Sequence, residues 1–147
     1  MKPTAKAYLE SVRSAVLREQ QLTDKVEILA ARLDGVSGID YSRDNGAASS
    51  DGKALERRVM LMMDARRDLD EQRATVEMML DQAAGMLRAM AGAGCPASVC
   101  DELEYYYLWG MSTREISRMV HLSESRLRAH RIDALAVSDG FVPLDAA

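Results

Sequence analysis

Residues 112–130 read STREISRMVHLSESRLRAH, and this stretch decides how the C-terminal part of the chain folds. Ser112 lies three residues before Glu115, the spacing of a capping box, which satisfies two free amides at the start of a helix. Ser123 is a second N-cap signal. The stretch therefore predicts two short helices joined by a tight corner at His121, with arginines clustered on the second helix.

A third helix is predicted just before this stretch. Val99, Leu103 and Tyr107 repeat by fours and indicate a helix over residues 97–109, which Gly110 ends. The three helices would share a small apolar core. Its predicted members are Leu103, Ile116, Val120, Leu122, Leu127 and Leu135. Three helices with two short corners predict a helix-turn-helix unit.

Two long apolar seams precede this unit. A walk by alternating steps of four and three meets apolar residues at seven of eight positions from Tyr8 to Leu33, and at nine of eleven from Leu55 to Met90. Such seams need a partner helix, because alone they would expose a continuous apolar stripe to water. The two helices can fold back as an antiparallel hairpin or pair between chains.

Charged residues interrupt both seams, namely Glu19, Arg66 and Arg73. One interpretation is that they pair inside the seam and fix its register. The other is that their long side chains reach out to the seam's edge, which we favour.

The composition supports a helical protein, since 48% of the residues are apolar, 29% are charged and only 5% are aromatic. We expect an all-α fold, a long antiparallel helical hairpin or coiled coil followed by a C-terminal three-helix unit. The predicted segments are a first long helix at 1–33, a flexible connector rich in Gly, Ser and Asp at 34–52, a second long helix at 53–92, the helix-turn-helix unit at 96–140 and a tail at 141–147.

The net charge of −4 argues against a protein that coats nucleic acid over its whole surface. A DNA site would have to be local. Residues 112–135 carry five arginines against Glu115, Glu124 and Asp133, a net charge of +2, whereas residues 95–111 carry −3. The basic patch thus coincides with the predicted helix-turn-helix.

In such a unit the last helix lies in the major groove, and its first two turns face the base edges. Arg126 is the best candidate for a guanine contact, because its planar fork matches two acceptors on that base. Arginines on both helices would contact phosphates, and the amides at Ser123 and Glu124 would add to this. The predicted DNA-binding residues are Arg114, Arg118, Ser123, Glu124, Ser125, Arg126, Arg128, Ala129 and Arg131. Alternatively, the arginines form a solvated face with i,i+4 pairs.

The stretch YLWGMSTREISRMVHLSESRLRAHRIDAL, residues 107–135, resembles region four of bacterial sigma factors. The matching positions are Gly110, Ser112, Glu115, Ile116, Val120, Leu122, Ser123, Leu127, Ala134 and Leu135. The architecture of the whole chain is similar to small phage and prophage sigma-like proteins, a family often described only as a domain of unknown function. The resemblance implies a transcription regulator that binds double-stranded DNA.

Three positions depart from the family pattern. His121 stands where Gly is usual, Ser117 where Ala is usual, and Ala129 lacks a side chain that often reaches bases. The fold tolerates these changes, and they bear on base specificity. The chain lacks the other sigma regions, so we do not expect it to melt a promoter by itself.

Other classes of function are expected less. The sequence shows no paired carboxylates, no nucleophile with a base and no phosphate-binding loop in a plausible setting, so we expect neither an enzyme nor a bound cofactor. His130 could touch a phosphate or face solvent. Cys95 and Cys100 lack further ligands at zinc spacing and are expected as reduced thiols, with a disulfide as the alternative. With no signal-peptide core and no membrane span, we expect a cytoplasmic protein.

Three functions stay open on the sequence alone. The first is a DNA-binding regulator of phage type that dimerises or oligomerises through the long helices, so that two recognition helices meet half-sites about one DNA turn apart. The second is a protein-interaction module that docks on RNA polymerase or a phage partner. The third is a small terminase-like subunit for DNA packaging.

Overall fold

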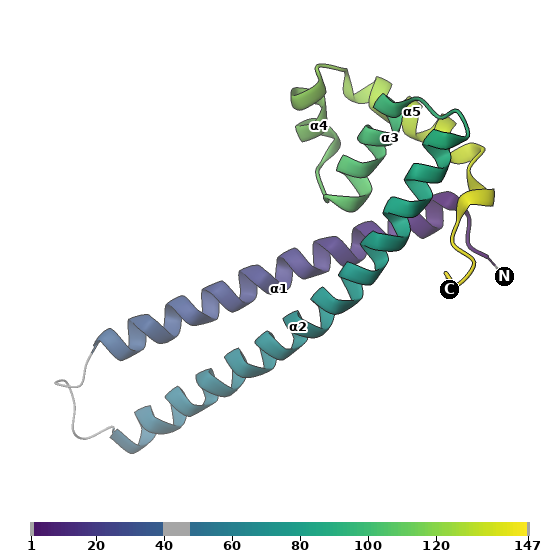
Figure 1. Cartoon of the computed structure of the whole chain (residues 1–147). Coiled ribbons are helices and arrows are strands. Elements are labelled where there is room, and N and C mark those ends of the chain that lie inside the picture. The colour runs from purple at the N-terminus through teal and green to yellow at the C-terminus, as the bar shows by residue number, and fades with distance from the viewer. Residues whose placement is uncertain (1, 40–47, 147) are drawn as a thin grey trace. The chain divides into compact units, whose positions relative to one another are not determined.

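The computed structural model describes residues 2–39 and 48–146, and this part of the chain is all-α, as predicted (Figure 1). Its elements, in order, are α1 (Ala5–Ile39), α2 (Ala48–Gly92), α3 (Ala97–Leu103), the π-helix η1 (Glu104–Leu108), α4 (Thr113–Val120), α5 (Glu124–Ala136) and the short 3₁₀ helix η2 (Asp139–Phe141).

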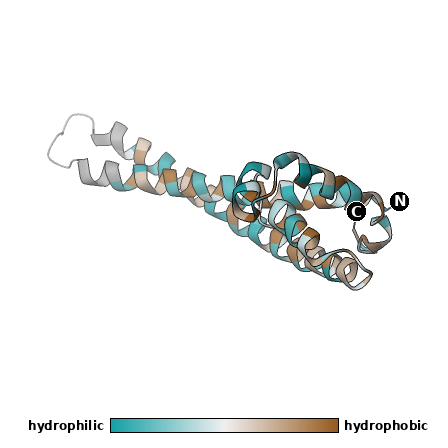
Figure 2. Cartoon of the chain, turned by 90° about the horizontal axis from the view of Figure 1, so that it is seen from above, coloured by the Kyte–Doolittle hydropathy of each residue, from teal (hydrophilic) through white to brown (hydrophobic). Residues whose placement is uncertain are grey.

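The chain divides into two compact units. Unit 1 comprises Met1–Leu17 and Thr75–Ala147, and unit 2 comprises Arg18–Ala74. Each long helix therefore contributes one segment to each unit. Figure 2 shows hydrophobic and hydrophilic residues interspersed along these helices, as expected of helices that are apolar on one side only.

Unit 1 has one hydrophobic core to which α1, α2, α3, η1 and α5 contribute buried residues. α1 and α2 each place one apolar face in it, at steps of three and four residues. The buried members of this cluster are Ala5, Tyr8, Leu9, Val12, Ala83, Met86, Leu87, Met90, Cys100, Leu103, Tyr107, Leu108, Leu135 and Val142.

The small core predicted for the helix-turn-helix unit is part of a larger core. Leu103 and Leu135 are buried against the long helices rather than only against their neighbours. Val120 and Leu122 are only half-buried, whereas Ile116 and Leu127 are buried. Three short helices offer too little apolar surface to close a core alone, so they share one with α1 and α2.

The predicted tail also belongs to unit 1. Val142 is 2% exposed, and Phe141 packs against the same core. Burial of these two apolar side chains is more favourable than their exposure to water, so the segment packs on the core instead of forming a solvated tail.

In unit 2, Leu22 of α1 and Ala65 and Leu69 of α2 are buried. Arg73 Nε lies 3.6 Å from Glu19 Oε1, which joins the two helices at this point. The two side chains are 53% and 29% exposed, so the pair lies at the edge of the buried face. Pairing of α1 and α2 along their whole length stays a prediction.

The predicted seam on α2 is buried or half-buried at seven of its eleven positions, and it departs from the observed stripe at Arg66 and Arg73 and at the exposed Leu55 and Val59. Ala65 is buried and Gln72 is half-buried, while Arg66 and Arg73 are exposed. The buried stripe therefore runs by steps of three and then four from Met62 through Ala65 and Leu69. Arg66 and Arg73 each follow a residue of this stripe and are exposed, because burying a charged group is costly.

The helices extend further than the sequence indicated. The connector was predicted at 34–52, but α1 continues to Ile39 and α2 begins at Ala48. Residues 40–47 lie outside the described part of the chain. Extending an existing helix by a residue is far easier than nucleating one, and a glycine in a helix costs only about 1 kcal/mol.

Candidate nucleic-acid interface

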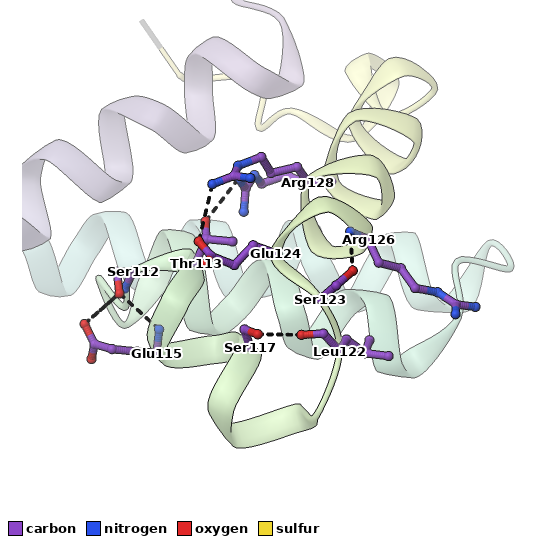
Figure 3. A network of polar contacts seen from close by, with 10 residues as sticks. Ser112, Thr113, Glu115, Ser117, Leu122, Ser123, Glu124, Arg126 and Arg128 are labelled. Carbon is purple, nitrogen blue, oxygen red and sulfur yellow. Dashed lines mark hydrogen bonds and ion pairs between the residues drawn. The ribbon is translucent and has the colours of Figure 1, made fainter.

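Both predicted N-caps are present at the starts of α4 and α5. Ser112 Oγ accepts a hydrogen bond from the Glu115 amide at 3.1 Å, and Glu115 Oε1 accepts one from the Ser112 amide at 3.3 Å. Ser123 Oγ likewise accepts from the Arg126 amide at 3.2 Å (Figure 3). These bonds fix where each helix begins, and hence which side chains occupy its first turn.

The corner between α4 and α5 contains two of the positions at which the sequence departs from the sigma pattern. His121 has φ 61° and ψ 38°, the left-handed conformation that usually favours glycine. Ser117 Oγ donates a hydrogen bond to the Leu122 carbonyl at 2.6 Å (Figure 3). The hydrogen bond from Ser117 thus stabilises the corner, in which His121 adopts a strained backbone conformation.

The outward face of α5 carries three small residues and one isoleucine. Ser125, Ala129, Ile132 and Ala136 are exposed and follow one another by four and three residues, so they lie on one side of the helix. Arg126 and Arg128 flank this face on opposite edges. Small side chains let a helix backbone come close to a flat or grooved partner, and the arginines would then lie on either side of it.

Arg126 is the arginine best placed for a partner outside the protein. Its side chain is exposed and points away from the network around Ser112 and Ser117 (Figure 3). It forms no ion pair with any residue that the structure describes. Arg128 is also exposed, but its Nη2 lies 3.4 Å from Glu124 Oε1, in a solvent-exposed i,i+4 pair worth at most a few tenths of a kcal/mol.

Arg114 and Arg118 are exposed on α4. Neither is in an ion pair within residues 2–39 and 48–146. Together with Arg126 and Arg128 they make four exposed arginines on α4 and α5. Of the remaining predicted residues, Ser123 and Ser125 are exposed, whereas Glu124 is half-buried.

Arg131 does not fit the predicted role of a phosphate contact. Its guanidinium carbon lies 3.8 Å from the centre of the Tyr106 ring, and its Nη2 donates to Thr113 Oγ1 at 3.4 Å. Arg13 of α1 covers the same ring at 3.9 Å. A cation held on an aromatic face has given up part of its hydration and its freedom to turn toward a ligand. Arg131 therefore serves the fold.

Arg13 and Tyr106 are the structural residues that the sequence reasoning missed. Arg13 Nη1 donates to the carbonyls of Tyr106 and Met111, the latter at 2.9 Å. Its donors thus serve carbonyls at the π-helix η1 and just after it, where α-helical hydrogen bonding has ended. No local signal could reveal this contact, because Arg13 and Tyr106 are 93 residues apart.

His130 is half-buried, and its Nδ1 is engaged by an acidic partner rather than free to touch a phosphate. Its Nδ1 lies 3.0 and 3.1 Å from the two carboxylate oxygens of Glu102, which is buried. Because a carboxylate only accepts hydrogen bonds, Nδ1 carries the proton. The Glu102–His130 contact joins α3 to α5 and so helps to hold α5 against α3.

Three buried groups of unit 1 have raised pKa values. Burial raises the pKa of Tyr8, and the charge of Asp145 adds to the rise. Burial raises the pKa of Tyr107 to about 12, although the nearby Arg131 works in the other direction. Burial also raises the pKa of the Cys100 thiol to about 12, with Cys95 adding to the rise. Both cysteines are free thiols. A thiol with so high a pKa stays protonated at neutral pH and is a poor nucleophile.

Comparisons with protein-family models, curated proteins and solved structures gave no match. Within the described ranges, no helix combines the length and apolar character needed to cross a bilayer. The function is therefore argued from the residues of the site.

Proposed function

We propose that the chain is a DNA-binding transcriptional regulator of the phage type, in which α5 enters the major groove of double-stranded DNA. Arg126 would read a guanine, and Arg114, Arg118 and Arg128 would contact phosphates. The resemblance of residues 107–135 to sigma region four supports this proposal, as do the two caps that set the start of each helix. The role of Arg131 as a phosphate contact is withdrawn.

The observation that carries the proposal is Arg126, which has no ion-pair partner within residues 2–39 and 48–146. It lies within the first turn of α5, exposed, beside the outward face with its three small residues. An arginine that served only the fold would be expected to find an acidic or aromatic partner, as Arg131 does. An accessible guanidinium beside the small side chains of the outward face supports base readout, because the helix can come close to the base edges there.

The test begins with selection of binding sites from a random duplex library by the purified protein. Affinities for the selected duplex and for point-mutated duplexes are then measured over a salt series. We expect Arg126→Ala to cost about 1–3 kcal/mol and to relax discrimination at one base pair. Arg128→Ala should weaken binding to all duplexes alike and reduce the salt slope by about 1.

A matched control is Arg58→Ala, which removes the same charge from an exposed position on α2 in unit 2. It should leave both the affinity and the salt slope unchanged. Binding that is insensitive to salt, or equal losses of discrimination for Arg126→Ala and Arg128→Ala, would contradict the proposal.

A second candidate function is docking on a protein such as RNA polymerase or a phage partner. Two exposed apolar side chains favour it. Trp109 is 54% exposed, with its ring 4.8 Å from that of Tyr105, and Met119 of α4 is 44% exposed. Exposed aromatic and Met side chains are enriched in protein interfaces.

Co-purification separates the two functions. Association with polymerase should persist when Arg114, Arg118, Arg126 and Arg128 are replaced, if docking is independent of DNA. Loss of association together with DNA binding would remove the second candidate.

A further inference from the structure

A hollow of about 530 Å³ lies in unit 1 between the first turns of α1, the π-helix η1 and one side of α5. Arg128 and Ile132 belong to its α5 wall, and Lys6 to its α1 wall. It borders the outward face of α5, since Ile132 and Ala136 belong to both. Any ligand that covers that face on the Arg128 side also covers this hollow.

The charges that line the hollow are not all available to a ligand. Arg131 is held on the Tyr106 ring, and Asp139 Oδ1 accepts a hydrogen bond from the Ala5 amide at 2.8 Å. The remaining cations are Lys6 and Arg128, the latter with its solvent-exposed Glu124 contact at 3.4 Å. Glu10 and Asp139 are the carboxylates of the lining. Lys6 is exposed and is in no ion pair with a described residue.

The apolar part of the lining matches the rest of a nucleic-acid backbone. Ile132 follows Arg128 by one helical turn and is 68% exposed. A DNA strand alternates a charged phosphate with an apolar deoxyribose edge. A guanidinium and an isoleucine one turn apart offer this alternation a partner at each position. A free phosphate ion would use only the cations.

We propose that Lys6 and Arg128 together hold one phosphodiester of the bound duplex, so that the start of α1 extends the DNA interface beyond α4 and α5. This inference rests on the proposed function. Lys6 belongs to a part of the chain more than 100 residues before α5, outside the stretch that resembles sigma region four. The ligand class is a phosphodiester of double-stranded DNA, with the sugar next to it against Ile132.

The test measures duplex affinity by fluorescence anisotropy from 50 to about 300 mM salt for Lys6→Gln and for a matched control, Lys25→Gln. Lys25 is an exposed lysine of the same helix that belongs to unit 2. One lost phosphate contact should lower the slope of log K against log salt by about 0.9 and reduce affinity about three- to tenfold for every sequence. Lys25→Gln should match the wild type.

Two further variants sharpen the result. Glu10→Gln removes one of the two carboxylates that line the hollow and should raise affinity about two- to fivefold, the opposite direction from Lys6→Gln. The double variant Lys6→Gln with Arg128→Gln should lose less than the product of the single losses, since both residues would serve one phosphate. Circular dichroism checks that each variant keeps its helices.

The outcomes are distinct. A wild type that binds no duplex overturns this inference and the proposed function together. A wild type that binds DNA with a slope unchanged by Lys6→Gln overturns this inference alone. Inorganic phosphate is the probe for the other source of the ligand. If it binds the DNA-free protein in a Lys6-dependent way while duplex affinity ignores Lys6, the hollow takes a free anion and the proposal fails.

Discussion

The hydroxyl of Tyr8 lies in the core of unit 1 without a hydrogen-bond partner among the described residues, and the residue is 5% exposed. An unsatisfied buried hydroxyl costs about 1–3 kcal/mol. We expect Tyr8→Phe to raise the free energy of unfolding by about 1 kcal/mol, measured by urea denaturation at pH 7. Tyr105→Phe, at a half-buried ring, should change it little. A destabilised Tyr8→Phe would contradict the unsatisfied state of this hydroxyl.

Tyr107 makes stability depend on pH in the alkaline range. Burial raises its pKa from 10.0 to about 12 in the folded protein, so the unfolded chain loses the phenol proton first. The associated stability is complete below pH 10 and is lost as pH rises from 10 to 12, by about 2–3 kcal/mol in total.

The measurement compares urea denaturation of the wild type and Tyr107→Phe at several pH values. Cys100 titrates over an overlapping range, so the difference between the two proteins isolates the tyrosine. The free energy of unfolding of the wild type should fall relative to that of Tyr107→Phe between pH 10 and 12. Parallel curves for the two proteins across this range would contradict the raised pKa of Tyr107.

The sequence supports the choice of Arg126 and Arg128 as exposed residues of the last helix, because caps and periodicity place them on its surface. It does not separate them from Arg131, which has the same chemistry and similar spacing. Arg131 is not available to a ligand because it lies on the Tyr106 ring. Arg13 of α1 covers the same ring. Contacts between residues so distant in sequence have no local signature.

Among the elements, the corner between α4 and α5 stores backbone strain at His121. A residue other than glycine in the left-handed region costs roughly 1 kcal/mol. His121→Gly should therefore raise the free energy of unfolding by about 0.5–1 kcal/mol in thermal or urea melts. The histidine side chain is exposed, so no packing is lost. Lower stability for His121→Gly would mean that the imidazole itself supports the corner.

The phase of the buried stripe on α2 is testable with two matched substitutions in unit 2. Ala65 is 1% exposed, whereas Ala74 is exposed. Ala65→Asp should cost about 3 kcal/mol or more, because it buries a charge. Ala74→Asp should cost roughly 0.7 kcal/mol, the loss of helix propensity alone. Urea denaturation that gives equal losses would contradict the stripe through Ala65.

Helices and their caps follow from the sequence more reliably than the faces they bury. The Ser112 and Ser123 caps are confirmed because each depends on two or three neighbouring residues. The seam of α2 was placed correctly from Val76 to Met90, but it missed Ala65 and Gln72 beside the exposed Arg66 and Arg73, because Ala and Gln carry a weak apolar signal. The π-helix η1 was not predicted at all, and it replaces the last turns of the helix expected at 97–109. The Tyr106 carbonyl of η1 accepts its hydrogen bond from Arg13, a donor far away in the sequence.

At the scale of the whole molecule, the shared core of unit 1 changes how the proposed DNA-binding region is supported. α5 does not rest only on α3 and α4, since Leu135 is buried in the cluster that includes α1 and α2. The Glu102–His130 pair and the Arg131–Tyr106 contact add two polar ties to this support.

The central claim is that α5 enters the major groove. Dimethyl sulfate modifies guanine N7, which faces that groove, so protection of the selected duplex from this reagent tests the claim most directly. We expect one or two guanines to be protected at saturating wild-type protein, and one of them to become reactive again with Arg126→Ala at equal occupancy. Reactivity of every guanine unchanged at full occupancy would contradict the insertion of α5.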